Sequence, residues 1–183
     1  MKKIALATVL ALAASVAAAA EMGLEYKDYN GVNGDPNAQS YSLSVAGTVA
    51  PGVKLDAKFQ NKQTDGTNAL STRLETGVTG SATISGPVSA YVRGAVGEKF
   101  TNTTNFSYYS IEPGVAVKQG PIGVSLGWRY RDAFTDANGD QTRTWRAKVG
   151  YDVTKVDNVY VGYDRQRGDT EYNAWRVGYV RSF

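Results

Sequence analysis

The fold of this chain is decided by one stretch, Ile122-Gly123-Val124-Ser125-Leu126-Gly127-Trp128-Arg129-Tyr130-Arg131. Its even-numbered positions are all aliphatic or aromatic, and its odd-numbered positions are all glycine, serine or arginine. Because successive side chains of a β-strand point to opposite faces, this pattern indicates a strand with one apolar face and one polar face.

The same two-residue alternation runs along the rest of the chain. Val53, Leu55 and Phe59 share one face of the next example, opposite Lys54 and Lys58. We count ten such segments, at roughly 22–29, 40–49, 53–61, 71–84, 88–99, 106–118, 122–133, 142–153, 158–167 and 171–183. No helical periodicity competes with them after the first twenty residues.

Short and long connections between these segments alternate strictly. The four short ones lie at 51–52, 86–87, 120–121 and 154–157, and the longer ones at 31–39, 62–70, 101–105, 135–141 and 168–170. Tight turns on one side and longer loops on the other are typical of outer-membrane barrels. No linker or change of composition divides the segments, which indicates one domain.

A water-soluble sandwich or lipocalin-like barrel, with the apolar face inward, would show the same alternation. The aromatic residues near the strand ends, the two kinds of connection and the end of the chain at Phe183, on a strand, favour lipid outside. In hydrocarbon every backbone polar group needs a protein partner, so strands cross only as a closed barrel. We predict an all-β, transmembrane, antiparallel up-and-down barrel of about ten strands, with eight or twelve as alternatives.

Pro113 is the reason for the lower alternative, because a proline inside a strand removes a hydrogen bond between strands. We interpret Glu112-Pro113-Gly114 as a bulge. A break at this point would reduce the number of strands to eight.

Residues 1–20 have the three parts of a secretory signal peptide: a basic start, an apolar run and an alanine-rich end. The alternative is a membrane anchor, but the apolar run is shorter than the roughly 20 residues that span a bilayer. We predict cleavage after Ala20, a barrel over residues 21–183, and a location in the outer membrane of a Gram-negative cell.

The composition excludes several kinds of chemistry. The 183 residues include no His and no Cys, which excludes Ser-His-Asp and Cys-His nucleophiles, disulfides and the usual zinc sites. Cleavage removes two of the 20 cationic residues and none of the 17 acidic ones, so the formal net charge falls from +3 to +1. That value does not indicate nucleic-acid binding. We expect no enzymatic activity, no cofactor and no metal.

Three further patterns have ordinary interpretations. The stretch 136–140 begins like a calcium-binding loop but lacks the closing glutamate, so we interpret it as a turn. Glu75 and Glu112 resemble the carboxylate pair of a glycosidase, but we favour a structural role for them over an enzymatic one. The tryptophans at 128, 145 and 175 are interpreted as lipid-facing anchors.

The end of the chain is similar to a known signal. The stretch 176–183, with Gly178, Tyr179 and the terminal Phe183, resembles the C-terminal assembly signal of bacterial outer-membrane barrels. Arg181 departs from that pattern, which usually has an apolar or aromatic residue there. The resemblance implies three partners: outer-membrane lipid, periplasmic chaperones and the barrel-assembly machinery.

Sorting the charges by face predicts a cationic interior. Twelve cations fall on the inward face, against six acids. The cations are Lys27, Lys54, Lys58, Arg73, Arg93, Lys99, Lys118, Arg129, Arg131, Arg146, Lys148 and Arg176, and the acids are Glu25, Asp56, Glu75, Glu112, Asp152 and Asp164. We expect Glu112 to form an ion pair with Arg129, and Asp164 to form ion pairs with Arg146 and Arg176. Two interpretations stay open: a salt-bridged core that passes nothing, or a basic conduit that attracts anions.

Three stretches resemble a particular family of porins. The stretches 109–115 and 124–131, with the closing segment 172–183, are similar to the small monomeric porins that pass acidic oligosaccharides, the oligogalacturonate-specific or KdgM-type family. The resemblance covers about a third of the chain after cleavage. It implies a twelve-stranded barrel with an arginine- and lysine-lined pore, in which Arg129, Arg131 and Arg176 would contact anions.

We therefore expect an outer-membrane porin that gives passive diffusion of small, preferentially anionic solutes, with acidic sugars as one class. The predicted pore-lining residues are Arg73, Arg93, Arg129, Arg131, Arg146, Lys148 and Arg176, and their predicted acid partners are Glu75, Glu112 and Asp164. The alternative is a closed structural or surface-interaction barrel whose core does not conduct.

Overall fold

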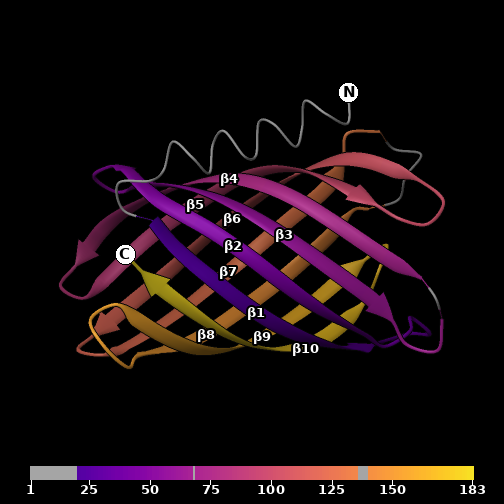
Figure 1. The fold of residues 1–183 in the computed structure, drawn as a ribbon. Helices are drawn as coiled ribbons and strands as arrows, with labels where there is room; N and C mark the ends of the chain where they lie inside the picture. The colour runs from indigo at the N-terminus through magenta and orange to yellow at the C-terminus, as the bar shows by residue number, and fades with distance from the viewer. Residues whose placement is uncertain (1–19, 68, 136–139) are drawn as a thin grey trace.

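The computed structural model describes residues 20–67, 69–135 and 140–183, which form ten antiparallel strands closed into one barrel. The strands are β1 (Ala20–Gly31), β2 (Ala38–Ala50), β3 (Val53–Thr64), β4 (Leu70–Ser85), β5 (Val88–Phe100), β6 (Asn105–Gln119), β7 (Ile122–Ala133), β8 (Thr142–Asp152), β9 (Asp157–Gly168) and β10 (Tyr172–Ser182). Each strand pairs with its neighbours in the chain, and β1 pairs with β10 to close the wall (Figure 1).

The predicted ten-stranded up-and-down barrel is confirmed. The alternatives of eight and twelve strands, and the twelve strands implied by the porin resemblance, do not describe this wall. Within the described ranges, no helix is long and apolar enough to cross a membrane. Of the predicted signal peptide, residues 1–19 lie outside the described residues, and Ala20 begins β1.

Pro113 lies inside β6 without a bulge, so that prediction is wrong. Ile111 lies opposite Tyr130 and Gly114 lies opposite Gly127, which is one continuous register on both sides of the proline. The missing N–H interrupts pairing with β7 locally but inserts no extra residue, and β6 therefore continues past it. Register shifts occur instead beside the tight turns of the β2–β3 and β4–β5 hairpins.

The tight turns lie together at one end of the barrel. Gly52, Gly86 and Gly120 have φ of 73°, 51° and 57°, a conformation that glycine adopts without steric cost. The last strand ends there too, because the Ser182 N–H donates to the Val156 carbonyl in the β8–β9 turn at 2.8 Å. In Figure 1 this turn end is on the left, and the longer loops form the loop end on the right.

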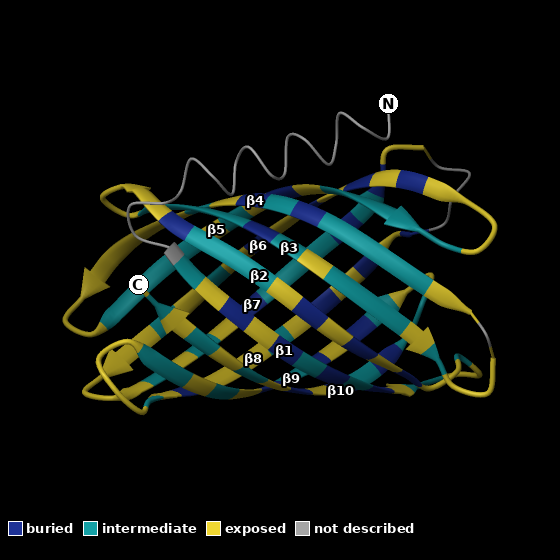
Figure 2. Ribbon diagram, viewed as in Figure 1, coloured by how far each residue is buried: buried dark blue, intermediate teal, exposed yellow. Residues whose placement is uncertain are grey.

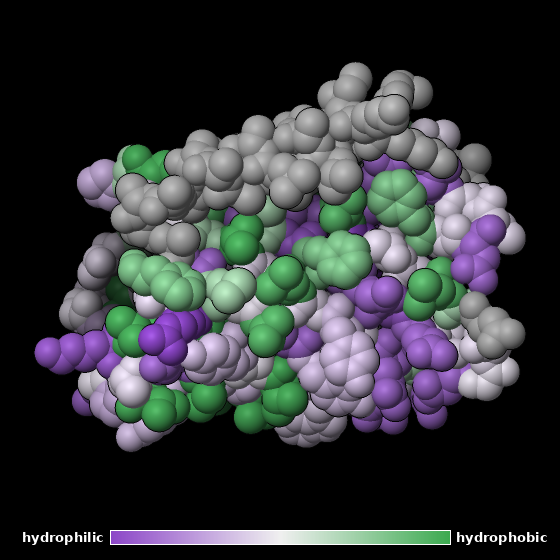
Figure 3. Space-filling view, viewed as in Figure 1, coloured by the Kyte–Doolittle hydropathy of each residue, from purple (hydrophilic) through white to green (hydrophobic). Residues whose placement is uncertain are grey.

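The two faces of the wall are chemically opposite. Outward-facing Leu126, Val161 and Val177 are each about half exposed, whereas inward-facing Thr144 and Asp164 are fully buried. Figure 2 shows this alternation along the strands, and Figure 3 shows apolar side chains spread over one side of the wall. This arrangement reverses that of a water-soluble protein, and an outer face rich in exposed apolar side chains suits a wall that faces lipid.

Candidate functional site in the lumen

The centre of the lumen is organised around Asp164 on β9, whose exposed fraction is 0%. Its carboxylate contacts three cations from three other strands: Lys27 Nζ at 2.6 Å, Arg176 Nε at 3.0 Å and Arg146 Nε at 3.6 Å. A buried carboxylate is stable only when its charge is compensated. Asp164 therefore ties β1, β8 and β10 together across the interior.

Glu25 on β1 forms a second junction toward the turn end. It contacts Lys58 Nζ at 2.8 Å and Arg176 Nη1 at 3.3 Å, and it accepts a hydrogen bond from the Tyr160 hydroxyl at 2.8 Å. Arg176 thus bridges Glu25 and Asp164. A chain of ion pairs consequently runs along the inner wall from β3 through β1 and β10 to β9.

Two other carboxylates pair with arginines on the opposite part of the wall. Glu112 contacts Arg146 Nη1 at 2.6 Å, and Glu75 contacts Arg93 Nη1 at 2.8 Å. Glu75 also accepts a hydrogen bond from the Tyr108 hydroxyl at 3.0 Å. These pairs leave neither glutamate available as a free catalytic carboxylate.

Inward glycines make room for these long side chains. A Cβ at Gly77 or at Gly162 would overlap the guanidinium of Arg93 or Arg176, respectively. Gly127 on β7 lies under Glu112, which reaches across β7 to Arg146 on β8. Glycine on the polar face is therefore part of the packing of the charged core.

Asp140 forms a further junction at the loop end. It is 2% exposed and contacts Arg131 Nε at 2.7 Å and Lys99 Nζ at 3.1 Å. Burial alone would raise the pKa of Asp140, but the nearby charges of Arg131, Arg73 and Lys99 outweigh it and lower that pKa below its usual value. Asp140 is therefore ionised at neutral pH.

Aromatic rings fill the interior near this junction. Tyr29 and Tyr172 meet edge to face with their ring centroids 4.7 Å apart, and both are buried with Ala38 and Ala174. Lys62 Nζ lies 4.7 Å from the centre of the Tyr29 ring, a cation–π contact. The loop half of the lumen is consequently dense.

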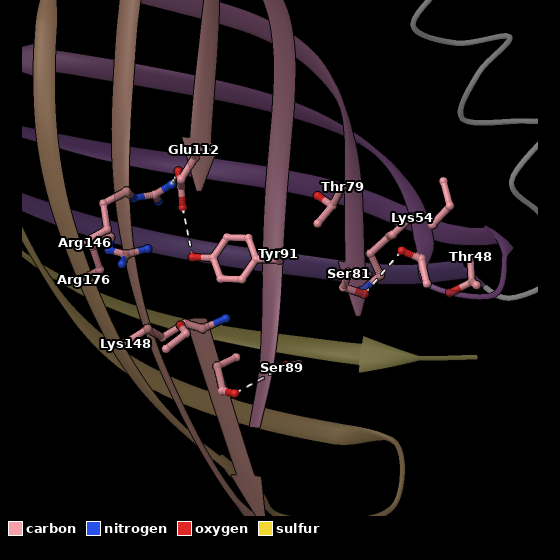
Figure 4. Close-up of a pocket in the computed structure, with 14 residues that line it drawn as sticks. Thr48, Lys54, Thr79, Ser81, Ser89, Tyr91, Glu112, Arg146, Lys148 and Arg176 are labelled. Carbon is pink, nitrogen blue, oxygen red and sulfur yellow. Dashed lines mark hydrogen bonds and ion pairs between the residues drawn. The ribbon is translucent and has the colours of Figure 1, made fainter. Parts of the chain in front are cut away.

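The free space inside the barrel is unevenly distributed. At the turn end lies a cavity of about 520 Å³, here called the vestibule, lined by Lys54, Tyr91, Lys148 and others. Figure 4 shows Arg146, Arg176 and Lys148 on one side of the vestibule and Lys54, Thr48 and Ser81 on the other. At the centre the cavity volume falls to about 30 Å³.

Most of the predicted site residues form ion pairs inside the barrel, and the partner differs from the expected one for Glu112. Asp164 contacts both Arg146 and Arg176, whereas Glu112 contacts Arg146 rather than Arg129. Arg131 contacts Asp140. Arg73, Arg129 and Lys148 form no ion pair with any residue in the described part of the chain, and Lys148 lies 5.3 Å from the centre of the Tyr160 ring.

Three lumen residues were missed in the sequence. Lys62 lies two residues after Gln60 and therefore on the same inward face of β3. Glu21 lies four residues before Glu25 on the inward face of β1, and it contacts Lys54 at 2.7 Å. The predicted segments 22–29 and 53–61 exclude both residues, because they are shorter than β1 and β3. Asp140 had no signal of its own, because a loop residue has no periodic neighbours. It belongs to the suspected calcium-loop stretch, whose residues 136–139 lie outside the described residues.

The predicted assembly residues lie on β10 and just after it. Gly178 lies beneath the Tyr160 ring, the Tyr179 hydroxyl donates to Asp157 at 2.5 Å, and Phe183 is exposed at the turn end. Their role in assembly stays a prediction.

Solved structures of other barrels are similar to this one, among them two porins and one autotransporter domain. The KdgM porin has a TM-score of 0.51 and 12% identity, over 89% of this chain and 99% of that one. The NanC porin has a TM-score of 0.50 and 11% identity, over 91% and 100%. The β domain of the Bordetella autotransporter BrkA has a TM-score of 0.53 and 12% identity, over 91% and 100%.

At such identities the likeness shows the fold alone. The resemblance to KdgM-type porins is thus confirmed as a resemblance of fold. No family model matches the chain, and no curated protein matches it.

Proposed function

We propose that this chain is an outer-membrane porin that lets small solutes diffuse passively through its lumen, with a preference for anions. The apolar outer wall and polar interior support a membrane barrel, and the likeness in fold to the KdgM and NanC porins supports a porin. The observation that carries the anion preference is the set of inward cations without an ion pair in the described chain: Lys62, Arg73, Arg129 and Lys148.

The proposed mechanism is electrostatic attraction followed by diffusion. Lys54, Lys148, Arg146 and Arg176 line the vestibule, where Glu112 is the one acid among the lining residues in the described chain. Low-dielectric walls concentrate the field of such charges and raise the local concentration of anions. An anion in the vestibule then needs a path past Asp164 and Glu25, where ion pairs must exchange partners as it moves.

The alternative is a closed barrel with a structural or surface-interaction role. The central cavity of about 30 Å³ and the ion pairs among its lining residues, such as Lys27–Asp164 and Lys58–Glu25, favour this second function. In that case the vestibule is a blind cavity, and no stable conductance is expected.

Single-channel recording in planar bilayers tests the proposal. We expect small, stable current steps and a reversal potential in asymmetric KCl that indicates chloride over potassium. Arg129→Ala combined with Arg146→Ala should reduce that selectivity, because it removes two lumen charges. Arg181→Ala, at a half-exposed position beside Asp157, is the matched control and should leave it unchanged.

Two results would contradict the porin proposal. One is the absence of current steps from correctly folded protein, which would favour the closed barrel. The other is cation preference that the double variant leaves unaltered, which would remove the role of the arginines.

We further propose that residues 1–20 are a signal peptide and that residues 21–183 reach the outer membrane through periplasmic chaperones and the barrel-assembly machinery. Amino-terminal sequencing of protein from isolated outer membranes tests this, with Glu21 as the expected first residue. Protein that keeps its first residues, or remains in the inner membrane, would contradict it.

A further inference from the structure

We propose that the centre of the lumen is a binding site for one small monovalent anion, such as chloride, held by Arg73 and Arg129. This inference goes beyond solute passage, because a resident anion would hold the charged core together whether or not the barrel conducts.

The cavity at the centre has more positive than negative lining residues. Its cations are Lys27, Lys58, Arg73, Arg129, Arg131 and Arg146, and its acids are Glu25, Glu75 and Asp164. Four of these six cations form ion pairs. Arg73 and Arg129 form none within the described ranges, and each has a buried Nε atom without a hydrogen-bond partner there.

The carboxylates around the cavity are already engaged by other cations. Glu25 contacts Lys58 and Arg176, Glu75 contacts Arg93, and Asp164 contacts Lys27, Arg146 and Arg176. Asp140, at the loop end, is shared by Arg131 and Lys99. No carboxylate of the described residues forms an ion pair with Arg73 or Arg129, although Asp140 acts on Arg73, and Glu75 and Glu112 act on Arg129, from a greater distance.

Partial burial favours a nearby counter-charge, because Arg73 and Arg129 are only partly exposed and the Nε atom of each is buried. A partly buried charge is stabilised by an opposite charge placed close to it, and a guanidinium does not lose its proton in a protein. A buried lysine can become neutral when its pKa falls, but Arg73 and Arg129 stay charged. A mobile anion in the cavity would bring a negative charge within hydrogen-bond distance of both guanidinium groups.

The volume of the cavity selects the kind of anion. The central cavity of about 30 Å³ is far smaller than the vestibule of about 520 Å³, and it exceeds the roughly 10–15 Å³ that one water molecule needs on the same measure. A monatomic halide fits this space, whereas a sugar acid or a phosphorylated metabolite is several times larger. The site is therefore assigned to chloride, with bromide as its natural probe.

Anomalous diffraction from crystals of the folded barrel in sodium bromide tests the site directly. The expected result is a bromide peak in the central cavity within hydrogen-bond distance of both guanidinium groups. Peaks confined to the outer surface or the vestibule would mean an adventitious ion only, and would overturn the proposal.

Unfolding in urea provides a test in solution. In sodium chloride, compared with sodium gluconate at equal ionic strength, the folded-to-unfolded ratio should rise about tenfold for each tenfold increase of chloride above its dissociation constant. Arg73→Gln and Arg129→Gln should each abolish this chloride response. Arg181→Gln, outside the central cavity, is the control that keeps it.

An identical response to chloride and gluconate in the unaltered protein would also overturn the proposal, even if a variant fails to fold. The outcome is separable from the porin proposal. If the barrel shows no current in bilayer recordings but bromide density lies in the central cavity, the anion site is supported and the porin proposal is not. If the barrel conducts but that density is absent, the anion site is contradicted and the porin proposal is not.

Discussion

Asp164 forms more ion pairs than any other carboxylate in the described part of the chain, because three cations share it. Asp164→Asn would keep the shape of the side chain and leave Lys27, Arg146 and Arg176 facing one another with one negative charge fewer. Loss of one partner of a buried ion pair typically destabilises a protein by about 3–5 kcal/mol. We expect a loss of that size in the free energy of unfolding, measured by urea titration of the barrel in lipid vesicles.

The control for this variant is Asp152→Asn, because Asp152 contacts the exposed Lys118 at the turn end. It should change the unfolding midpoint little. Equal effects of the two substitutions would show that the buried network does not stabilise the barrel.

Asp140 makes the loop end sensitive to acid. Its pKa is lowered in the folded barrel because the charges of Arg131, Arg73 and Lys99 outweigh the effect of burial. A carboxyl group with a lowered pKa contributes stability above its unfolded pKa of about 3.9, and that contribution is lost as pH falls through the folded value. Asp140→Asn should therefore be destabilised by about 3 kcal/mol at neutral pH.

The difference between Asp140→Asn and the unaltered protein should shrink as the pH falls below about 4, because protonated Asp140 is neutral like asparagine. Urea unfolding at several pH values measures this. A difference that does not vary with pH would show that the Asp140 ion pairs do not carry the effect.

At the scale of strands, the packing of β9 against β10 depends on a tyrosine that covers a glycine. A Cβ at Gly178 would overlap the Tyr160 ring, whose hydroxyl donates to Glu25 at 2.8 Å. Gly178→Ala should displace the ring and break that hydrogen bond, with a loss of about 1–3 kcal/mol, as is usual for overpacking. Gly123→Ala is the matched control, since nothing lies within 4 Å of a Cβ at Gly123 on β7.

This comparison should be made by refolding purified protein, because Gly178 is also a predicted assembly residue whose effect in cells would have a second cause. Equal stability of the two variants would contradict the packing argument.

The strands themselves were predictable because the two-residue period is a local property of the chain. Ten segments and their approximate bounds follow from it, and so does the face on which Asp164 and Arg176 lie. The partner of Glu112 does not follow. Which inward residues meet depends on the tilt of the strands and on Gly127, which lets Glu112 pass over β7 to Arg146.

At the scale of the whole molecule, the outward face predicts how the barrel sits in lipid. Trp145 and Trp175 are 55% and 57% exposed on that face, near the loop end of β8 and β10. In brominated lipid vesicles we expect most of their fluorescence to be quenched, while iodide in water quenches little. The control is protein unfolded in urea beside the same vesicles, for which this order should reverse.

Tryptophans that respond to iodide but not to brominated lipid would contradict the membrane barrel itself, and with it every proposal about the lumen.

The sequence by itself determined that this chain forms a barrel of about ten strands with an apolar outer face and a charged inner face. The reason is that the two-residue alternation of each strand and the length of each connection can be seen in the sequence itself. Only the tertiary structure decided which charges meet, that Asp140 pairs with Arg131 and Lys99 at the loop end, and that Arg73 and Arg129 form no ion pair within the described residues. The physical reason is that side-chain alternation repeats every two residues along one strand, whereas contacts across a lumen depend on the register and stagger of all ten strands at once.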